Sequence, residues 1–217
     1  MAIYDTEEEQ LEQLKKWWEN NQSSVIYGVI GALVISAGVN MWQKHKADSR
    51  NQASQLYTEL LTSEAEEKND SVEKLAEKLQ AEHGSSTYAQ YAELILVKQK
   101  VQSGDLEGAK TLLQNEIKKN NSPEFKHIFR LRLIQLMLAT KQYEQGLQQI
   151  AEVDPAAREG FASNYDELQG DLYLALDRVD EARNAYQSAM RSGHASPMLQ
   201  FKLDDLTPPA LEKLSAQ

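Results

Sequence analysis

The stretch "NYDELQGDLYLALDRVDEARNAYQSAM", residues 164–190, carries the strongest fold signal in the chain. Small and large residues recur along it at the spacings of two helices packed against each other, on Gly170, Tyr173, Ala182, Tyr186 and Ala189. The segment "LDRVDEA" separates the two halves of this pattern and predicts the turn of a helical hairpin.

The same spacing recurs twice further upstream. Thirty-six residues earlier, the equivalent positions hold Ile134, Met137, Gly146, Ile150 and Val153. A further 37 residues earlier, the segment "SGDLEGA" again predicts a turn, and the matching residues around it are Leu106, Ala109 and Leu113. The positions of this copy that match poorly are Val97, Lys100 and Glu116. These spacings are those of the tetratricopeptide repeat, a helical hairpin of about 34 residues.

One such hairpin cannot bury its apolar face alone, so about three or more must stack. Residues 50–82 indicate a fourth, divergent hairpin with a longer acidic connection at "SEAEEKND". We therefore predict an all-α protein in which a tetratricopeptide-like solenoid fills residues 44–217, with the tail "DDLTPPALEKLSAQ" as its cap or frayed end. Ordinary packing of helical hairpins without true repeat geometry is the alternative.

The stretch "NNQSSVIYGVIGALVISAGVNMWQ", residues 20–43, holds no charged residue in a chain otherwise rich in Glu, Gln and Lys. About 20 helical residues cross the roughly 30 Å hydrocarbon core of a bilayer. The three tryptophans of the chain all flank the apolar part, as is typical of residues at a membrane interface. We predict a single transmembrane helix at residues 22–43, preceded by a short acidic segment at residues 1–21.

A buried core helix and a cleaved signal peptide are the alternatives for this stretch. Core helices are usually shorter and seldom apolar around their whole circumference. A signal peptide begins with basic residues and has an apolar part of about 7 to 15 residues. Residues 1–19 instead contain six acidic residues against Lys15 and Lys16. The membrane anchor is therefore the favoured interpretation.

Two patterns accompany the predicted span. Leu11, Leu14 and Trp18 form an apolar stripe on a short helix at residues 5–19, which predicts either a lead-in helix at the membrane surface or a docking peptide. Small residues recur every four positions inside the span, at Ser24, Gly28, Ala32 and Ser36. Such a face lets another transmembrane helix approach closely, and the same residues can equally well face lipid.

The charges beside the span do not fix its orientation. Lys and Arg near a span favour the cytoplasmic side. Two lysines precede the span, and Lys44, Lys46 and Arg50 come after it. The sequence therefore leaves open on which side of the membrane the repeat domain lies.

The composition argues against several kinds of chemistry. A net charge of −10 without a basic cluster argues against nucleic acid as a ligand. The absence of cysteine excludes disulfides and thiolate metal sites. None of the four histidines has a second histidine or a cysteine at metal-ligand spacing, and no phosphate loop or nucleophile elbow occurs. We predict a protein without enzymatic activity or cofactor, although an enzyme of unfamiliar type would need only a pocket with convergent titratable groups.

Binding is the function that remains. Stacked hairpins curve and offer a concave surface, which the first helix of each pair usually lines. The positions that we predict to line it are Tyr91, Lys98, Arg130, Gln135, Asp166 and Gln169.

Essentially the whole chain resembles a known family, and the resemblance is most specific in the N-terminal third. The resemblance lies in "IYDTEEEQLEQLKKWWENN" before the span, in the glycine-bearing span that ends near Trp42, and in "ADSRNQASQLYTELL" after it. It continues through "LAEKLQAEHGSSTYAQYAELILVKQ", where a short loop precedes a helix that opens at Thr87-Tyr88-Ala89. These segments are similar to those of the YfgM family, the ancillary subunits of the bacterial SecYEG translocon.

This resemblance implies a single-pass protein of the bacterial inner membrane, with residues 1–21 in the cytoplasm and residues 44–217 in the periplasm. It also implies association with SecYEG and with the membrane-anchored periplasmic chaperone PpiD, help for exported client proteins, and a tie to envelope stress. The family has no catalytic motif to transfer. The alternative is a scaffold or regulator that is anchored by the same span, faces the cytoplasm and engages a signalling protein.

Overall fold

The computed structural model describes residues 7–158, 160–193 and 197–206, and this part of the chain contains helices and turns but no strand. The helices are α1 (Glu7–Ala65), α2 (Asn69–His83), α3 (Thr87–Gln102), α4 (Leu106–Lys119), α5 (Pro123–Ala139), α6 (Tyr143–Ala151), the 3-10 turn η1 (Pro155–Arg158), α7 (Ala162–Ala175), α8 (Val179–Arg191) and α9 (Pro197–Asp205). The all-α prediction is confirmed. Residues 207–217 of the predicted tail lie outside the described residues.

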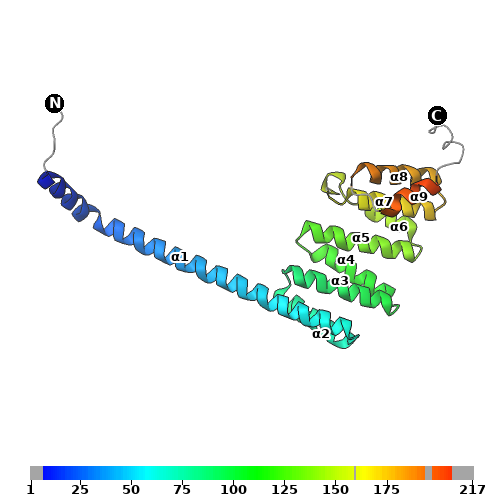
Figure 1. Cartoon of the computed structure of the whole chain (residues 1–217), viewed down its shortest axis with the longest axis horizontal. Coiled ribbons are helices and arrows are strands. Elements are labelled where there is room, and N and C mark those ends of the chain that lie inside the picture. The colour runs from blue at the N-terminus through cyan, green and yellow to red at the C-terminus, as the bar shows by residue number, and fades with distance from the viewer. Residues whose placement is uncertain (1–6, 159, 194–196, 207–217) are drawn as a thin grey trace, which may run out of the picture.

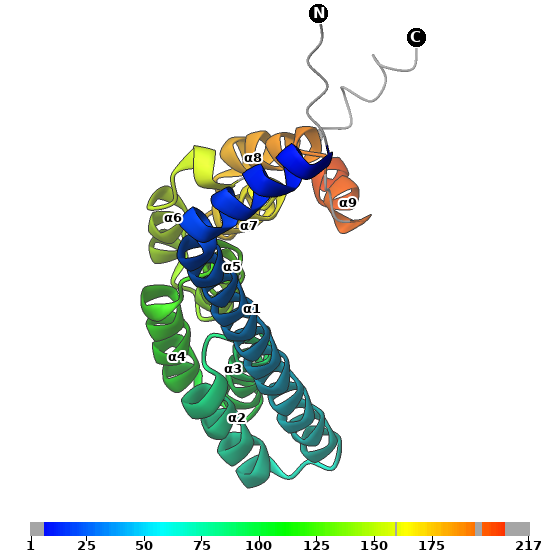
Figure 2. The ribbon, with the colours of Figure 1, turned by 90° about the vertical axis from the view of Figure 1, so that its left-hand side faces the viewer.

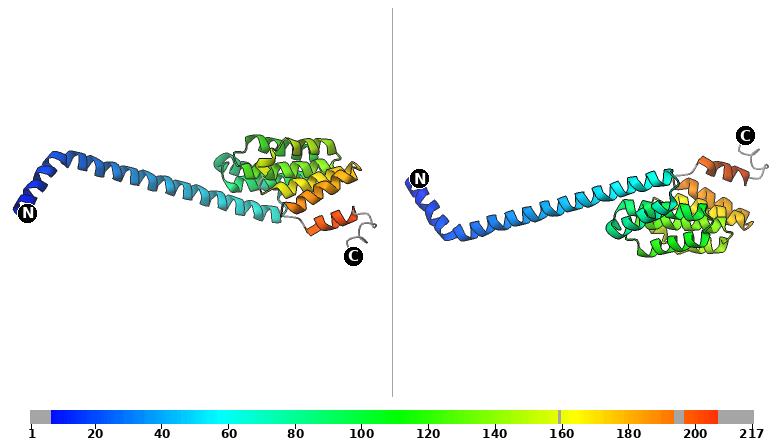
Figure 3. Two further views of the ribbon diagram at one scale, coloured as in Figure 1. Left: turned by 90° about the horizontal axis from the view of Figure 1, so that it is seen from above. Right: turned by 90° about the horizontal axis from the view of Figure 1, so that it is seen from below.

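Helix α1 is one continuous helix of 59 residues, which at 1.5 Å per residue is about 90 Å long. It forms an arm that extends far beyond the stacked helices, bent in its dark-blue first part and nearly straight after that (Figures 1 and 3). The stretch predicted to be a short helix, residues 5–19, is helical in its described part and continues without a break as the first part of α1. The first proline of the chain is Pro123, so no proline interrupts this helix.

The last part of α1 belongs to the core of the repeat domain. Ala53 and Leu60 are fully buried and pack with Val72 and Leu79 of α2 and with α3. Ser49 Oγ lies 3.0 Å from His83 Nδ1 at the end of α2, where the two antiparallel helices begin to touch. The first hairpin therefore consists of the end of α1 together with α2, and a single helix joins the predicted span to this core.

The remaining helices pair as α3/α4, α5/α6 and α7/α8, and the hairpins stack in chain order. Figure 2 shows a curved stack with α2, α4 and α6 along its outer side and α3, α5 and α7 along its inner side. Buried clusters lie between successive hairpins rather than within one of them. Helix α9 covers the last hairpin, with Leu199 packed against Ala182 and Tyr186 of α8.

The turn inside each hairpin has the same backbone geometry. A residue with left-handed φ stands at the same point of all four turns: Glu67 (57°), Gly104 (83°), Lys141 (61°) and Asp177 (59°). These residues are 37, 37 and 36 positions apart, so the divergent first hairpin conforms to the repeat as well. Its connection is only Glu66–Lys68, which is shorter than the predicted acidic connection because α1 and α2 extend into that stretch.

The small residues of the repeat allow close contact between helices. A methyl group added at Gly170 would overlap the ring of Tyr186 on the paired helix α8. One added at Gly146 would lie 2.9 Å from Leu172 Cδ2 in the next hairpin. Ala109 and Ala182, at the positions equivalent to Gly146, are fully buried. The large residues fill the space that these close approaches leave, as the sequence predicted.

The turn geometry predicts that Lys141→Gly stabilises the domain. Glycine adopts left-handed φ without the steric cost that a side chain carries, so we expect the free energy of unfolding to rise by about 0.5–1 kcal/mol. Thermal or urea unfolding of the full chain in detergent measures this change. Lys141→Ala is the matched control: it removes the same side chain but keeps the strain, and an equal gain in both variants would contradict the explanation.

Candidate partner-binding groove

Three adjoining hollows run along the inner side of the stack. The first, of ≈ 650 Å³, lies between the end of α1 and α3. The second, of ≈ 450 Å³, lies between α3 and α5, and the third, of ≈ 400 Å³, lies between α5 and α7. Lys98 borders the first two hollows, and Arg132 and Gln135 border the last two. Because neighbouring hollows share wall residues, they form one surface, which we call the inner groove.

The α3/α5 hollow is the apolar part of the inner groove. Its wall includes Leu94, Val97, Val101, Leu136 and Ala139. Val101 is 42% exposed, so an apolar surface is open to solvent at this point. Amide and cationic side chains surround the apolar wall: Lys98, Gln102, Arg132 and Gln135. Such a hollow can hold an apolar side chain of a partner while polar groups at its rim bind the partner's backbone carbonyls.

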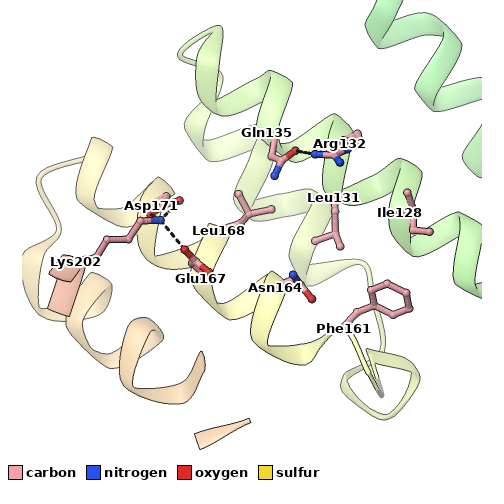
Figure 4. A pocket seen from close by; sticks show the side chains of 10 residues that line it. All are labelled: Ile128, Leu131, Arg132, Gln135, Phe161, Asn164, Glu167, Leu168, Asp171 and Lys202. Carbon is pink, nitrogen blue, oxygen red and sulfur yellow. Dashed lines mark hydrogen bonds and ion pairs between the residues drawn. The ribbon is translucent and has the colours of Figure 1, made fainter. Parts of the chain in front are cut away.

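The α5/α7 hollow is more polar and is closed at one end by α9 (Figure 4). Lys202 of α9 reaches across to α7, with its Nζ 2.8 Å from Glu167 Oε1 and 2.8 Å from Asp171 Oδ1. Burial lowers the pKa of Lys202, but its hydrogen bonds with Asp171 and Glu167 outweigh burial, so the pKa is raised. Two acids of the segment "DELQGD", Glu167 and Asp171, therefore hold the last helix against α7.

The structure brings two of the predicted groove positions together. Lys98 and Gln135 lie on facing helices and border the same α3/α5 hollow. Lys98 also forms an ion pair with Glu64 of α1, at 2.8 Å. Arg132 donates a hydrogen bond of 2.8 Å to Gln135, which orients the amide at the junction of two hollows.

The other four predicted positions do not border any of the three hollows. Tyr91 is 44% exposed and its ring packs edge-on against Phe125, at 5.5 Å between centroids. Asp166 accepts a 2.7 Å hydrogen bond from Ser188, and Gln169 donates to the hydroxyl of Tyr173. Arg130 is half-buried beside Tyr165. Tyr91, Arg130 and Asp166 thus contact neighbouring helices, whereas Gln169 contacts a residue of its own helix.

The predicted positions missed most of the groove wall, although a signal for it was present in the sequence. Leu94 and Val101 stand four residues before and three residues after Lys98, so they lie on the same face of α3. The same face of α5 carries Gln135 together with Ile128 and Arg132, seven and three residues before it, and Ala139, four residues after it. Helical periodicity applied to two correct positions would therefore have given much of the wall. It would not have given Lys202, which comes from a helix outside the repeat.

The predicted span lies apart from the rest of the described chain. None of the residues in its most apolar stretch is buried, so the interpretation of the stretch as a buried core helix is wrong. The helix is long and apolar enough to cross a membrane. The four small residues Ser24, Gly28, Ala32 and Ser36 are exposed, and a methyl group added at Gly28 would meet nothing within 4 Å.

A second group of polar residues is buried between α3 and α4. Glu93 and Glu116 have side chains that are 7% and 0% exposed, and both face Lys119, at 3.9 Å and 2.6 Å. Burial and the charge of Glu116 raise the pKa of Glu93 to about 7, against the opposing effect of Lys119. Among the described residues, no group of three or more His, Asp or Glu side chains is placed to hold a metal ion.

The raised pKa of Glu93 predicts that stability falls as pH rises from about 4.5 to about 7. In this range the folded chain keeps a proton on Glu93 that the unfolded chain has released, so folding is favoured by protons. Glu93→Gln removes the ionisation, and we expect its free energy of unfolding to exceed that of the unchanged chain at pH 8 by up to about 3 kcal/mol.

Urea unfolding of the full chain at pH 5 and pH 8 tests this prediction. The difference between Glu93→Gln and the unchanged chain should be small at pH 5 and large at pH 8. Glu107→Gln, which changes an exposed carboxylate on α4, is the control and should show no such pH dependence. A difference between Glu93→Gln and the unchanged chain that is the same at both pH values would rule the explanation out.

The comparisons with known proteins agree with this architecture. A family model described as "Tetratricopeptide repeat-like domain" matches residues 15–208. The ancillary SecYEG translocon subunit of Escherichia coli (strain K12) is 30% identical over 210 residues, covering 95% of this chain and 100% of that protein. The chain belongs to the family of ancillary SecYEG translocon subunits. The resemblance stated from the sequence is thereby confirmed.

Two further matches are more distant. The ancillary SecYEG translocon subunit of Haemophilus influenzae is 26% identical over 208 residues, covering 95% of this chain and 100% of that protein. Among solved structures, the crystal structure of the P58(IPK) TPR domain aligns with a TM-score of 0.45 at 12% identity, over 75% of this chain and 47% of that chain. Ancillary translocon subunits with repeats of this kind are scaffolds, which confirms the prediction of a non-enzymatic protein.

Proposed function

We propose that this chain is an ancillary subunit of SecYEG in a bacterial inner membrane. Residues 22–43 anchor it, residues 1–21 lie in the cytoplasm, and the repeat domain, residues 44–217, lies in the periplasm. There it links the translocon to the membrane-anchored chaperone PpiD and assists client proteins that emerge into the periplasm. The observation that carries the proposal is the 30% identity, over 95% of this chain, with a protein named as a translocon subunit.

The geometry of α1 supports this role. Only about ten residues separate the end of the predicted span at Gln43 from Ala53 in the repeat core, which is about 15 Å of helix. Helix α1 has no break in this interval. A stiff connection of this length keeps the inner groove close to the membrane and in a fixed direction relative to the span. A partner in the same membrane then meets the groove at one defined position.

The inner groove supplies the binding surface. In the proposal, an apolar side chain of an extended partner segment enters the α3/α5 hollow, next to Val101 and Leu94. Lys98, Arg132 and Gln135 bind carbonyl groups of that segment. We also predict that a partner contacts the surfaces beside the groove, at Tyr91, Arg130, Asp166 or Gln169.

The span supplies a second contact. The exposed small residues Ser24, Gly28, Ala32 and Ser36 lie along one side of α1. In the proposal, this face packs against a transmembrane helix of the translocon or of PpiD, and the rest of the span contacts lipid of the inner membrane.

One observation favours the opposite orientation. Lys44, Lys46 and Arg50 come after the span, against two lysines before it. A basic flank favours the cytoplasm, so the second candidate function is a membrane-anchored scaffold or regulator whose repeats face the cytoplasm. A folded domain of this size can cross the membrane despite such charges, and the likeness to the translocon subunits therefore favours the periplasmic proposal.

The orientation predicts which engineered cysteine a membrane-impermeant reagent reaches. The chain has no cysteine, so Ser192→Cys at the end of α8 and Thr6→Cys each introduce a single thiol. In cells with a permeabilised outer membrane, we expect a membrane-impermeant maleimide to label position 192 and not position 6. After lysis both should react. Labelling at position 6 alone would replace the periplasmic proposal by the cytoplasmic scaffold.

The groove predicts that Val101→Glu weakens partner binding. A carboxylate in the apolar hollow loses its hydration when a partner covers it, so we expect recovery of PpiD with the full chain in mild detergent to fall about tenfold. Met190→Glu, at a residue of similar exposure on α8 (38% against 42%), is the control and should keep normal recovery. If Val101→Glu shows normal thermal unfolding and recovers as much PpiD as the unchanged chain, the inner groove is not the surface that binds PpiD.

A further inference from the structure

A polar cavity of ≈ 340 Å³ lies where the C-terminal ends of α2 and α4 meet the beginnings of α3 and α5. Its wall includes Gln80, Gln90, Glu116, Lys119 and Asn120. No residue of this wall borders any hollow of the inner groove. The cavity is therefore a separate feature of the repeat domain.

Buried acceptor atoms gather at this cavity without a donor. Gln80 Oε1, Glu93 Oε2 and Glu116 Oε2 have no hydrogen-bond partner among the described residues. Glu116 is fully buried and borders the cavity, and Glu93 is joined to it through Lys119. A buried carboxylate oxygen without a donor is strongly destabilising. These oxygens therefore need hydrogen-bond donors that the described residues around the cavity do not supply.

The net charge of the buried side chains beside the cavity also favours a bound group that donates hydrogen bonds. Glu93 and Glu116 face one ammonium group, that of Lys119. With both carboxylates ionised, the cluster carries one excess negative charge in a poorly solvated place. The neutral side chains Gln90 and Asn120 satisfy each other through a hydrogen bond from Asn120 Nδ2 to Gln90 Oε1, so they leave this charge uncompensated. A bound cation would balance it.

The repeat itself does not require the carboxylate of Glu116. The position of Glu116 is filled by Val153 in the next hairpin and by Ala189 in the last one, and both are buried. An apolar residue therefore serves the packing of this position twice in the same molecule. A buried charged residue at a position that is apolar in the other hairpins is typical of a functional site.

We propose that this cavity binds a guanidinium group, in particular an arginine side chain of a polypeptide partner. A guanidinium is planar, keeps its charge at all relevant pH values and presents five N–H donors, which suit several carboxylate and amide oxygens at once. An ammonium group brings only three donors. The described residues around the cavity do not form a set of three or more His, Asp or Glu ligands for a metal ion.

The position of the cavity indicates which polypeptides can reach it. His83, one residue before the wall residue Gly84, contacts Ser49 of α1 at the end of the domain nearest to the predicted span. An arginine of a segment that leaves the membrane beside the span would pass this edge. Only this statement about location rests on the proposed anchor. The binding itself does not require the anchor or the translocon.

The test uses the purified full chain in detergent at pH 8, above the pKa of Glu93 of about 7. The probe is N-acetyl-arginine amide, and N-acetyl-citrulline amide is a control of the same shape without the charge. Binding to the folded state raises Tm, and we expect about 2–4 °C at saturating probe, at constant ionic strength. We expect no shift with citrulline amide. Equal shifts with both compounds, or none with either, would overturn the proposal.

Three variants tie the shift to the cavity. Glu116→Gln should abolish the response to arginine amide, because it removes the excess charge. Glu116→Val, which introduces the residue of the next hairpin, should fold and also lose the response. Glu107→Gln on the same helix is the matched control and should keep the full shift. A full response in Glu116→Gln, or a larger shift with magnesium chloride than with arginine amide, would overturn the assignment.

Discussion

The structure depends on the unbroken backbone hydrogen bonding of α1. This helix runs from Glu7 to Ala65 and includes both the predicted span and the first element of the repeat core. A flexible linker would let the domain turn freely above the membrane, whereas a helix transmits position and direction along its length. The helical arm seen in Figure 1 therefore fixes the position of the repeat domain relative to the predicted span. In the proposed function it decides at which height and in which direction the inner groove meets a partner.

The groove results from the way in which the hairpins close on one another. Gly170 lets the ring of Tyr186 approach the backbone of α7, and Gly146 lets Leu172 approach the backbone of α6. The position of Gly146 recurs as Ala109 and Ala182, 37 residues before it and 36 residues after it, and the hairpins that pack there form the curved stack of Figure 2. The first helices line the inner side of the curve. Packing inside the domain thus creates the surface that the proposed function uses.

Two places in the domain depart from the repeat, and both involve charge. At one, Lys202 from the added helix α9 binds Glu167 and Asp171 and closes the end of the groove. At the other, Glu93 and Glu116 occupy a buried position with a single lysine between them. The first departure ends the solenoid and protects its last apolar face. At the position of Glu116 the other hairpins have the buried apolar residues Val153 and Ala189, so packing does not require a carboxylate there, which is why it points to a ligand.

Sequence alone determined the helical class, the repeat, the turns and the long uncharged stretch, because each of these depends on local spacing and composition. The 36- and 37-residue periods even located the left-handed turns of three hairpins to within a few residues. Only the tertiary structure decided the features that arise from contacts between distant segments. It joined the span and the core in one helix, placed Lys98 beside Gln135, brought Lys202 to α7 and buried Glu93 against Glu116. These outcomes depend on how side chains from different helices share space, charge and water, and the spacing of residues along one helix does not contain that information.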